Sequence, residues 1–224
     1  MRTLAILPIK SFAAAKQRLG ASVADPLRAE LARAMVSDVL LALSSARGLE
    51  LTIVVTREPE AAATAREHGA LVVEDQVETG QSAAVALGVS RALEEGFVRV
   101  LCVPGDCPAL DPGEIQELLE GRVQDEPSVV IVPDRHGTGT NGLLLSPPAV
   151  IAASFGPGSC ARHQALAVAA GVRCRIEQPP SLLLDIDTGA DLQKLRERLA
   201  GQQAWAARTR EVLDAGALRA QTAA

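Results

Sequence analysis

The sequence predicts an α/β domain built on a mostly parallel β-sheet with right-handed crossovers. Short apolar runs that are typical of buried strands alternate with stretches of helical periodicity along most of the chain. Repeated βα units produce this alternation, because their strands lie parallel and their helices cover the sheet. The chain has 224 residues, 48% of them hydrophobic, which is enough for one domain with a full core.

The first half of the chain shows the clearest alternation. Asp25 is a suitable N-cap with Pro26 at the first helical position, and apolar residues recur every four positions over 27–43. A capping-box pattern over 111–114 opens a further short helix. The expected strands are 3–8, 49–56, 70–75 and 98–104, and the expected helices are 25–46, 59–68, 81–95 and a short one after 111.

The second half is less regular. Its expected strands are 127–133, 143–146, 172–177 and 181–187, and its expected helices are 160–170 and 188–199. We expect residues 1–200 to form one domain and residues 201–224 to form a helical tail. Two alternatives remain open for this tail: it packs on a neighbouring subunit of a homodimer, or it lies in solvent.

Composition excludes several classes of protein. The net charge is −5, aromatic residues are only 2% and Tyr is absent, so that neither a basic face nor stacking platforms for nucleic acid are expected. The apolar runs are too short to span a bilayer, and the N-terminus lacks the pattern of a signal peptide. The four cysteines have no CxxC spacing, which argues against a zinc site and favours free thiols in the cytoplasm.

Three aspartates follow apolar runs that we expect to be strands. Asp106 comes after the fourth expected strand, and Asp185 and Asp187 end the last one, where strand alternation places both on the same side. Thr188 and Asp191 offer a capping box for the next helix, which leaves Asp187 for another role. Carboxylates gathered at the carboxyl ends of strands suit Mg²⁺ and phosphate chemistry. The alternative is that each one simply caps a turn or a helix.

Two of the chain's three lysines, Lys10 and Lys16, lie in one short loop after the first strand, next to Arg18. The chain otherwise prefers arginine strongly, with nineteen of them. Lysine is a compact point charge that suits phosphate oxygens, and this loop lies where a nucleotide triphosphate would cross the strand end. The alternative is a solvated loop.

Segments rich in small residues offer sites for anions. The segment 137–142 matches GxGxxG, but it precedes an apolar run instead of following the first strand, so we reject a dinucleotide fingerprint and expect an anion cradle. Ser159 is the expected N-cap of the helix 160–170, with Gly156 before it, and a helix N-terminus attracts anions.

The start of the helix 81–95 is a candidate nucleotide site. Gly80 precedes it, and Gln81 and Ser82 are placed to hydrogen-bond a base or a ribose. The histidines show no ligand spacing, and we assign no role to them.

Six segments occur in an order that resembles the CofC/FbiD family of guanylyltransferases over residues 1–200. They are PIKSFAAAKQRL, GQSAAV, VPGDCPAL, DRHGTGTNGLLL, FGPGSCARH and LLLDIDTGADL. The resemblance implies a three-layer αβα sandwich of the nucleotide-diphospho-sugar transferase (GT-A) type. Carried onto this chain, it implies a metal site of Asp106, Asp185 and Asp187, an acid-substrate site of Thr140, Gly156 and Ser159, and a triphosphate loop with Lys16 and Arg18.

The reaction that the resemblance implies is transfer of GMP from GTP to a small phosphorylated three-carbon acid, with Mg²⁺ as cofactor, in coenzyme F-420 biosynthesis. We expect phosphoenolpyruvate, because Ala and Arg richness points to a GC-rich bacterial genome, with 2-phospho-L-lactate or 3-phosphoglycerate as alternatives. The labile product suggests hand-over to the next transferase of the pathway. Two other functions stay open: a sugar or molybdopterin nucleotidyltransferase, disfavoured by the lack of a GxGxR-type loop, and a GTP-binding protein without turnover.

Overall fold

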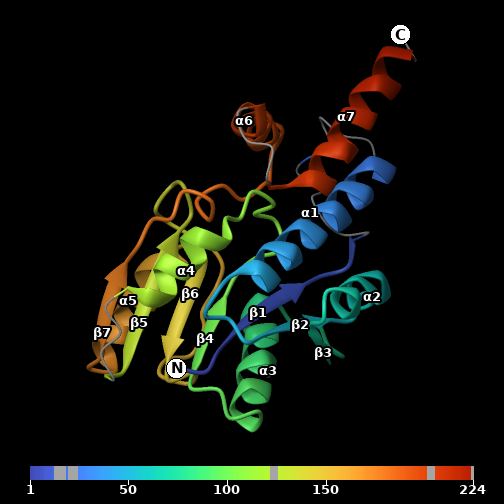
Figure 1. The fold of residues 1–224 in the computed structure, drawn as a ribbon. Coiled ribbons are helices and arrows are strands. Elements are labelled where there is room, and N and C mark those ends of the chain that lie inside the picture. Colours follow the sequence, from blue (N-terminus) through green and yellow to red (C-terminus); the bar gives the residue numbers. More distant parts are fainter. Residues whose placement is uncertain (13–18, 20–24, 122–125, 201–204, 223–224) are drawn as a thin grey trace.

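The computed structural model describes residues 1–12, 19, 25–121, 126–200 and 205–222, and within these residues the chain forms a seven-stranded sheet (Figure 1). The order of the strands across the sheet is β3-β2-β1-β4-β6-β5-β7. The strands are β1 (Thr3–Ile9), β2 (Leu51–Thr56), β3 (Leu71–Glu74), β4 (Arg99–Cys102), β5 (Ser128–Pro133), β6 (Thr140–Ser146) and β7 (Arg173–Ile176). Of these strands only β6 runs antiparallel to its neighbours, so the predicted mostly parallel sheet is confirmed.

Helices lie on both faces of the sheet and complete the expected three-layer αβα sandwich, and the last two helices pack against one of them (Figure 1). The helices are α1 (Asp25–Ser45), α2 (Pro59–Glu67), α3 (Gln81–Glu94), α4 (Pro112–Glu120), α5 (Ser159–Ala169), α6 (Gly189–Ala200) and α7 (Ala207–Thr222). Alternation along each strand sorts the core into two halves. In β1, Ala5 and Leu7 pack with α1, α2 and α4, whereas Leu4 and Ile6 pack with α3 and α5.

A third apolar cluster joins α1 to α6 and α7. Met35 of α1, Leu195 of α6 and Leu213 of α7 are all buried in it. The first turn of α7 is held by Asp38 of α1, whose two carboxylate oxygens accept from the backbone N–H groups of Arg208 (3.1 Å) and Thr209 (2.8 Å). Residues 208–216 of the C-terminal segment therefore pack on α1 of their own chain.

The last expected strand, 181–187, is wrong. This segment forms turns and irregular backbone, although Leu182 and Ile186 are fully buried. Its apolar residues fill the core on the α1 side and the third cluster instead of entering the sheet. An apolar run alone does not distinguish a strand from a loop that covers a core.

The expected loop over 134–142 is shorter than predicted, because residues 140–142 already belong to β6. Gly142 pairs with Val132 of β5, and a Cβ at Gly142 would come within 2.9 Å of the Val132 Cβ. This glycine therefore serves close packing between strands instead of an anion-binding turn.

Two of the expected helix caps are also corrected. Gly158, in the left-handed region at φ 71°, is the N-cap of α5, so that Ser159 is its first helical residue. Asp111 caps α4 as expected by accepting from Gly113 N at 2.7 Å, but Glu114 does not complete a capping box, because its carboxylate accepts from Ser181 N.

None of the described helices is both long and apolar enough to cross a membrane. The four cysteines are free thiols, as expected, and the three of lowest exposure are Cys102, Cys107 and Cys160.

Replacement of Asp38 by alanine should loosen α7 from α1. The substitution removes both acceptors at the first turn of α7, and loss of a helix cap costs about 1–2 kcal/mol. Hydrogen exchange should therefore show faster opening of the amides over 208–216, with the β1 and β4 amides unchanged. Glu67→Ala, which removes an exposed carboxylate from α2, is the control, and equal protection of α7 in both variants would contradict the capping role.

Candidate functional site

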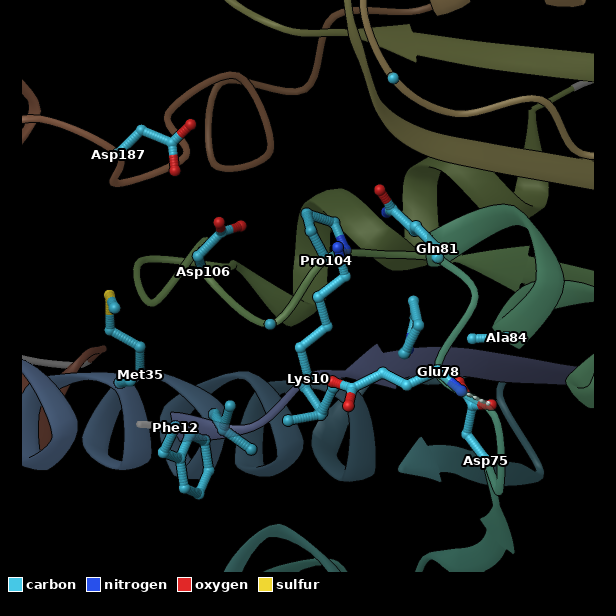
Figure 2. A pocket seen from close by; sticks show the side chains of 17 residues that line it. Lys10, Phe12, Met35, Asp75, Glu78, Gln81, Ala84, Pro104, Asp106 and Asp187 are labelled. Carbon is cyan, nitrogen blue, oxygen red and sulfur yellow. Dashed lines mark hydrogen bonds between the residues drawn. The ribbon is translucent and has the colours of Figure 1, made fainter. Parts of the chain in front are cut away.

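A cavity of about 690 Å³ opens at the edge of the sheet where the parallel strands end (Figure 2). Its walls come from segments far apart in the sequence: the end of β1, one side of α1, the start of α3, and the loops that follow β4 and precede α5 and α6. Because β6 runs the opposite way, its first residues lie at this same edge. The polar residues that line the cavity are Lys10, Asp75, Glu78, Gln81, Asp106 and Asp187.

The three predicted aspartates lie together at one end of the cavity. Asp106 and Asp187 line it, and Figure 2 shows their carboxylates facing the same space. Asp185 does not line the cavity; burial, then the charge of Asp106 and finally that of Asp187 raise the pKa of its carboxyl. The backbone N–H of Ile186 donates to the carbonyl of Asp106 at 3.0 Å, which joins the two segments.

Asn141 at the start of β6 holds the third carboxylate in place. Its amide nitrogen donates to Asp185 Oδ1 at 3.2 Å and to the carbonyl of Leu182 at 2.8 Å. The hydrogen bond lowers the pKa of Asp185 against the raising effect of burial. Asn141 was not among the sequence candidates, although its position directly after Thr140 was a usable signal.

The capping box predicted before α6 is confirmed. Asp191 accepts from the backbone N–H and the hydroxyl of Thr188 at 2.7 and 2.8 Å, and Asp191 N donates back to the Thr188 hydroxyl at 3.3 Å. Asp191 also accepts from Asp187 N and forms an ion pair with Arg135, although only 1% of it is exposed. This leaves the Asp187 side chain to face the cavity.

The acidic end has the donor groups that a magnesium ion takes, provided that a substrate would supply the remaining ligands. Within the described ranges, no three His, Cys, Asp or Glu side chains are arranged to hold a metal ion by themselves. Magnesium, however, is usually held by one or two carboxylates together with water and phosphate oxygens. Asp106 and Asp187 are the two candidates that reach the cavity, and the crowding of negative charge beside Asp185 is what a cation would relieve.

Of the candidate nucleotide residues, Gln81 lies at the other end, and Lys10 lies between it and the aspartates (Figure 2). Lys10, Gly80 and Gln81 line the cavity, and the backbone of Gly80 lies at φ 128°, which favours glycine. Ser82 does not line it, because its hydroxyl accepts from the backbone N–H of Phe155 at 2.9 Å. Lys16 and Arg18, the predicted catalytic cations, lie outside the described residues.

Two glutamates bind the backbone at residues 11 and 12, directly before residues that the structure does not describe. Glu78 accepts from Ser11 N at 3.2 Å, and Glu58 accepts from Phe12 N at 3.1 Å. Glu78 is itself held at φ 50°, with its own N–H bonded to Asp75. Sequence reasoning missed both glutamates, because no local pattern shows that they bind backbone far along the chain.

The candidate acid-substrate residues form a compact group, of which only Gly156 lines the cavity. The Ser159 hydroxyl donates to the Thr140 hydroxyl at 3.0 Å, and His163 Nδ1 lies 3.1 Å from the same Thr140 oxygen. The exposed fractions are 8% for Thr140, 1% for Ser159 and zero for His163. His163 had no assigned role, although its place one turn after Ser159 on the same helix face was a signal.

Comparison with known proteins places the whole fold in one family. A family model described as "Guanylyl transferase CofC like" matches residues 3–208. The chain is 47% identical over 214 residues to a "Phosphoenolpyruvate guanylyltransferase" of Conexibacter woesei, with 96% of each chain covered. It is 41% identical over 196 residues to a protein of the same name from Rubrobacter xylanophilus, which covers 87% of this chain and 94% of the relative.

Two further similarities are more distant. A "3-phospho-D-glycerate guanylyltransferase" of Phenylobacterium zucineum is 33% identical, with 93% of this chain and 94% of the relative covered. Among solved structures, a putative nucleotide-diphospho-sugar transferase from Desulfovibrio desulfuricans G20 superposes with a TM-score of 0.68 at 17% identity, covering 87% of each chain, which shows a shared fold. The motifs, the fold and the matched length agree, and the chain belongs to the CofC guanylyltransferase family.

Proposed function

We propose that this protein transfers GMP from GTP to phosphoenolpyruvate, which releases pyrophosphate. The observation that carries the proposal is the cavity itself, where carboxylates of two separate loops face a lysine and a helix N-terminus. The relative of 47% identity carries the name of this activity and matches the chain over nearly its full length.

The reaction forms one bond and breaks one. A phosphate oxygen of the acid attacks the α-phosphorus of GTP, and the bond between the α- and β-phosphates breaks with its electron pair leaving on pyrophosphate. No general base is required, because a phosphate monoester is already ionised at neutral pH. The main obstacle is the repulsion between two anions, so catalysis consists of positioning and charge neutralisation.

Asp106 and Asp187 would hold Mg²⁺, and the negative charge of Asp185 would add to the attraction of the ion to this end of the cavity. A bound magnesium ion would neutralise phosphate charge and align the reacting oxygens. Asn141 keeps Asp185 in place through its side-chain amide, and the capping box at Thr188 fixes the backbone that carries Asp187.

GTP would lie along the cavity from α3 to the aspartates. The N-terminus of α3 carries the partial positive charge of its free N–H groups, and Gln81 at its first position lines the cavity. Lys10 supplies a point charge in the middle, as Figure 2 shows. Lys16 and Arg18 remain the proposed partners of the departing pyrophosphate.

The acid would bind beside Gly156 and close to the hydroxyls of Thr140 and Ser159. Phosphoenolpyruvate is favoured over 3-phosphoglycerate because the relatives of higher identity carry its name, whereas the relative named for 3-phosphoglycerate is 33% identical. We further propose that the protein acts in the cytoplasm on the route to coenzyme F-420 and hands its labile product directly to the next enzyme. A homodimer remains a proposal, in which α7 beyond its contact with α1 would form the interface.

The acid substrate is decided by pyrophosphate release with GTP, Mg²⁺ and one acid at a time. We expect phosphoenolpyruvate to give a kcat/KM at least about tenfold above 2-phospho-L-lactate and 3-phosphoglycerate, because tenfold corresponds to about 1.4 kcal/mol of differential binding, on the order of one hydrogen bond. GTP binding without release of pyrophosphate in any mixture would contradict the proposed activity. ATP, CTP and UTP in place of GTP serve as controls for the base.

Replacement of Asp106 by asparagine should abolish transfer without unfolding the chain. The change keeps the size of the side chain but removes a charge that would face the metal, so kcat should fall by at least about 100-fold. Excess Mg²⁺ should restore part of the rate, since a weakened site fills at higher concentration. Glu117→Gln on the exposed face of α4 is the matched control, and near-normal turnover in Asp106→Asn would rule out this metal site.

A further inference from the structure

His163 of α5 is a fully buried imidazole that bridges two parts of the candidate acid site. One ring nitrogen, Nε2, lies 2.8 Å from the backbone nitrogen of Ser154, and the other, Nδ1, lies 3.1 Å from the Thr140 hydroxyl oxygen. The ring also meets the Phe155 ring edge-on, with centroids 5.2 Å apart. A buried polar ring that satisfies both its nitrogens is fixed in orientation.

The partners of the ring determine its tautomer. A backbone N–H can only donate, so Nε2 must accept from Ser154 and carries no hydrogen. Burial, and then the charge of Arg162, lower the pKa of His163 to about 4, so the imidazole is neutral at pH 7 with its hydrogen on Nδ1. Nδ1–H therefore donates to Thr140.

This tautomer sets the direction of the hydrogen bonds that follow. Thr140 accepts from His163 and also from the Ser159 hydroxyl, which lies 3.0 Å away. The two hydroxyl groups carry one hydrogen each, and the hydrogen of Ser159 forms the bond between them. The hydrogen of Thr140 can therefore donate to a ligand, and Thr140 is the more exposed of the two residues, at 8% against 1%.

We infer that His163 is a positioning residue for the acid substrate: it orients the Thr140 hydroxyl as a hydrogen-bond donor toward the substrate's carboxylate or phosphate oxygens. Had Nδ1 been the acceptor, it would have consumed the Thr140 hydrogen, and the hydroxyl would have turned its lone pairs toward an anion. This inference rests on the proposed function, because it takes Thr140 to lie against the acid.

The same ring also fixes the loop that carries Gly156. The loop before α5 is held at Ser154 by His163, at Phe155 by the Ser82 hydroxyl, and by Arg162, whose guanidinium donates to the carbonyls of Ser154 (3.0 Å) and Phe155 (3.1 Å). Gly156 lines the cavity. His163 is therefore one of three side chains that hold this loop, and it also contacts the hydroxyl that would meet the acid.

Two substitutions separate the two hydrogen bonds of the ring. In His163→Asn the amide nitrogen lies near the position of Nδ1 and can still donate to Thr140, but it cannot reach Ser154. In His163→Gln the amide reaches the position of Nε2 and can accept from Ser154, but the donor to Thr140 is lost. Steady-state rates with GTP and phosphoenolpyruvate give KM for each substrate, and His68→Gln, at the residue that follows α2, is the control.

The expected result is a rise in the KM for phosphoenolpyruvate of at least about tenfold in His163→Gln, with the KM for GTP within about twofold of wild type. His163→Asn should keep the KM for the acid within about threefold, as rescue by the variant that preserves the donor. Equal rises in both KM values, or an unchanged KM for the acid in His163→Gln, would overturn the inference.

Nitrogen NMR of the folded wild-type chain with ¹⁵N-labelled histidine tests the tautomer without any turnover. Signals of a protonated Nδ1 and an unprotonated Nε2 for His163 at pH 7 support the inference, and the opposite tautomer or a charged ring overturns it. This measurement also decides the matter if both variants fail to fold. Failure of the proposed function would be recognised separately, because wild-type protein would then release no pyrophosphate with phosphoenolpyruvate.

Discussion

The candidate site depends on holding three negatively charged aspartates close to one another, and one backbone hydrogen bond between their two loops contributes to this. The N–H of Ile186 donates to the carbonyl of Asp106, which brings the loop before α6 onto the loop after β4. Ile186 is fully buried in the third apolar cluster, and burial of such a side chain contributes about 1.5–3 kcal/mol. Asp185 and Asp187 flank it, so hydrophobic packing offsets the repulsion among the carboxylates.

The antiparallel strand β6 brings side chains from its first residues to the edge of the sheet where the parallel strands end. In an entirely parallel sheet, this edge would hold only the ends of strands. Since β6 begins there, Asn141 reaches Asp185 and Thr140 reaches α5. The same strand therefore touches both the proposed metal end and the proposed acid end, and a shift in its register would disturb both.

The mostly parallel sheet could be predicted because apolar alternation and helix caps are local signals, and the helix and strand boundaries mostly lie within a residue or two of those expected. The three-layer sandwich was implied by the family resemblance. The capping box at Thr188 is also confirmed. The loops that carry the three aspartates are joined, but the segment with Asp185 and Asp187 is not the strand that was expected. Sequence patterns could not separate the buried loop 181–187 from a strand, since both require the same apolar residues. Glu78 escaped notice because its partner is distant along the chain. Asn141 and His163 lie close in sequence to predicted site residues, but only the folded backbone brings them to the side chains that they contact.

Helix α1 connects the cavity to the far end of the chain. Its residues Ala32, Met35 and Val36 line the cavity, and Asp38, less than one turn further on, holds the first turn of α7. A mechanical load on the C-terminal segment would therefore be transmitted to the proposed nucleotide site. Affinity handles, surface tethers and fusion partners are better attached at Met1, which is exposed at the opposite edge of the sheet.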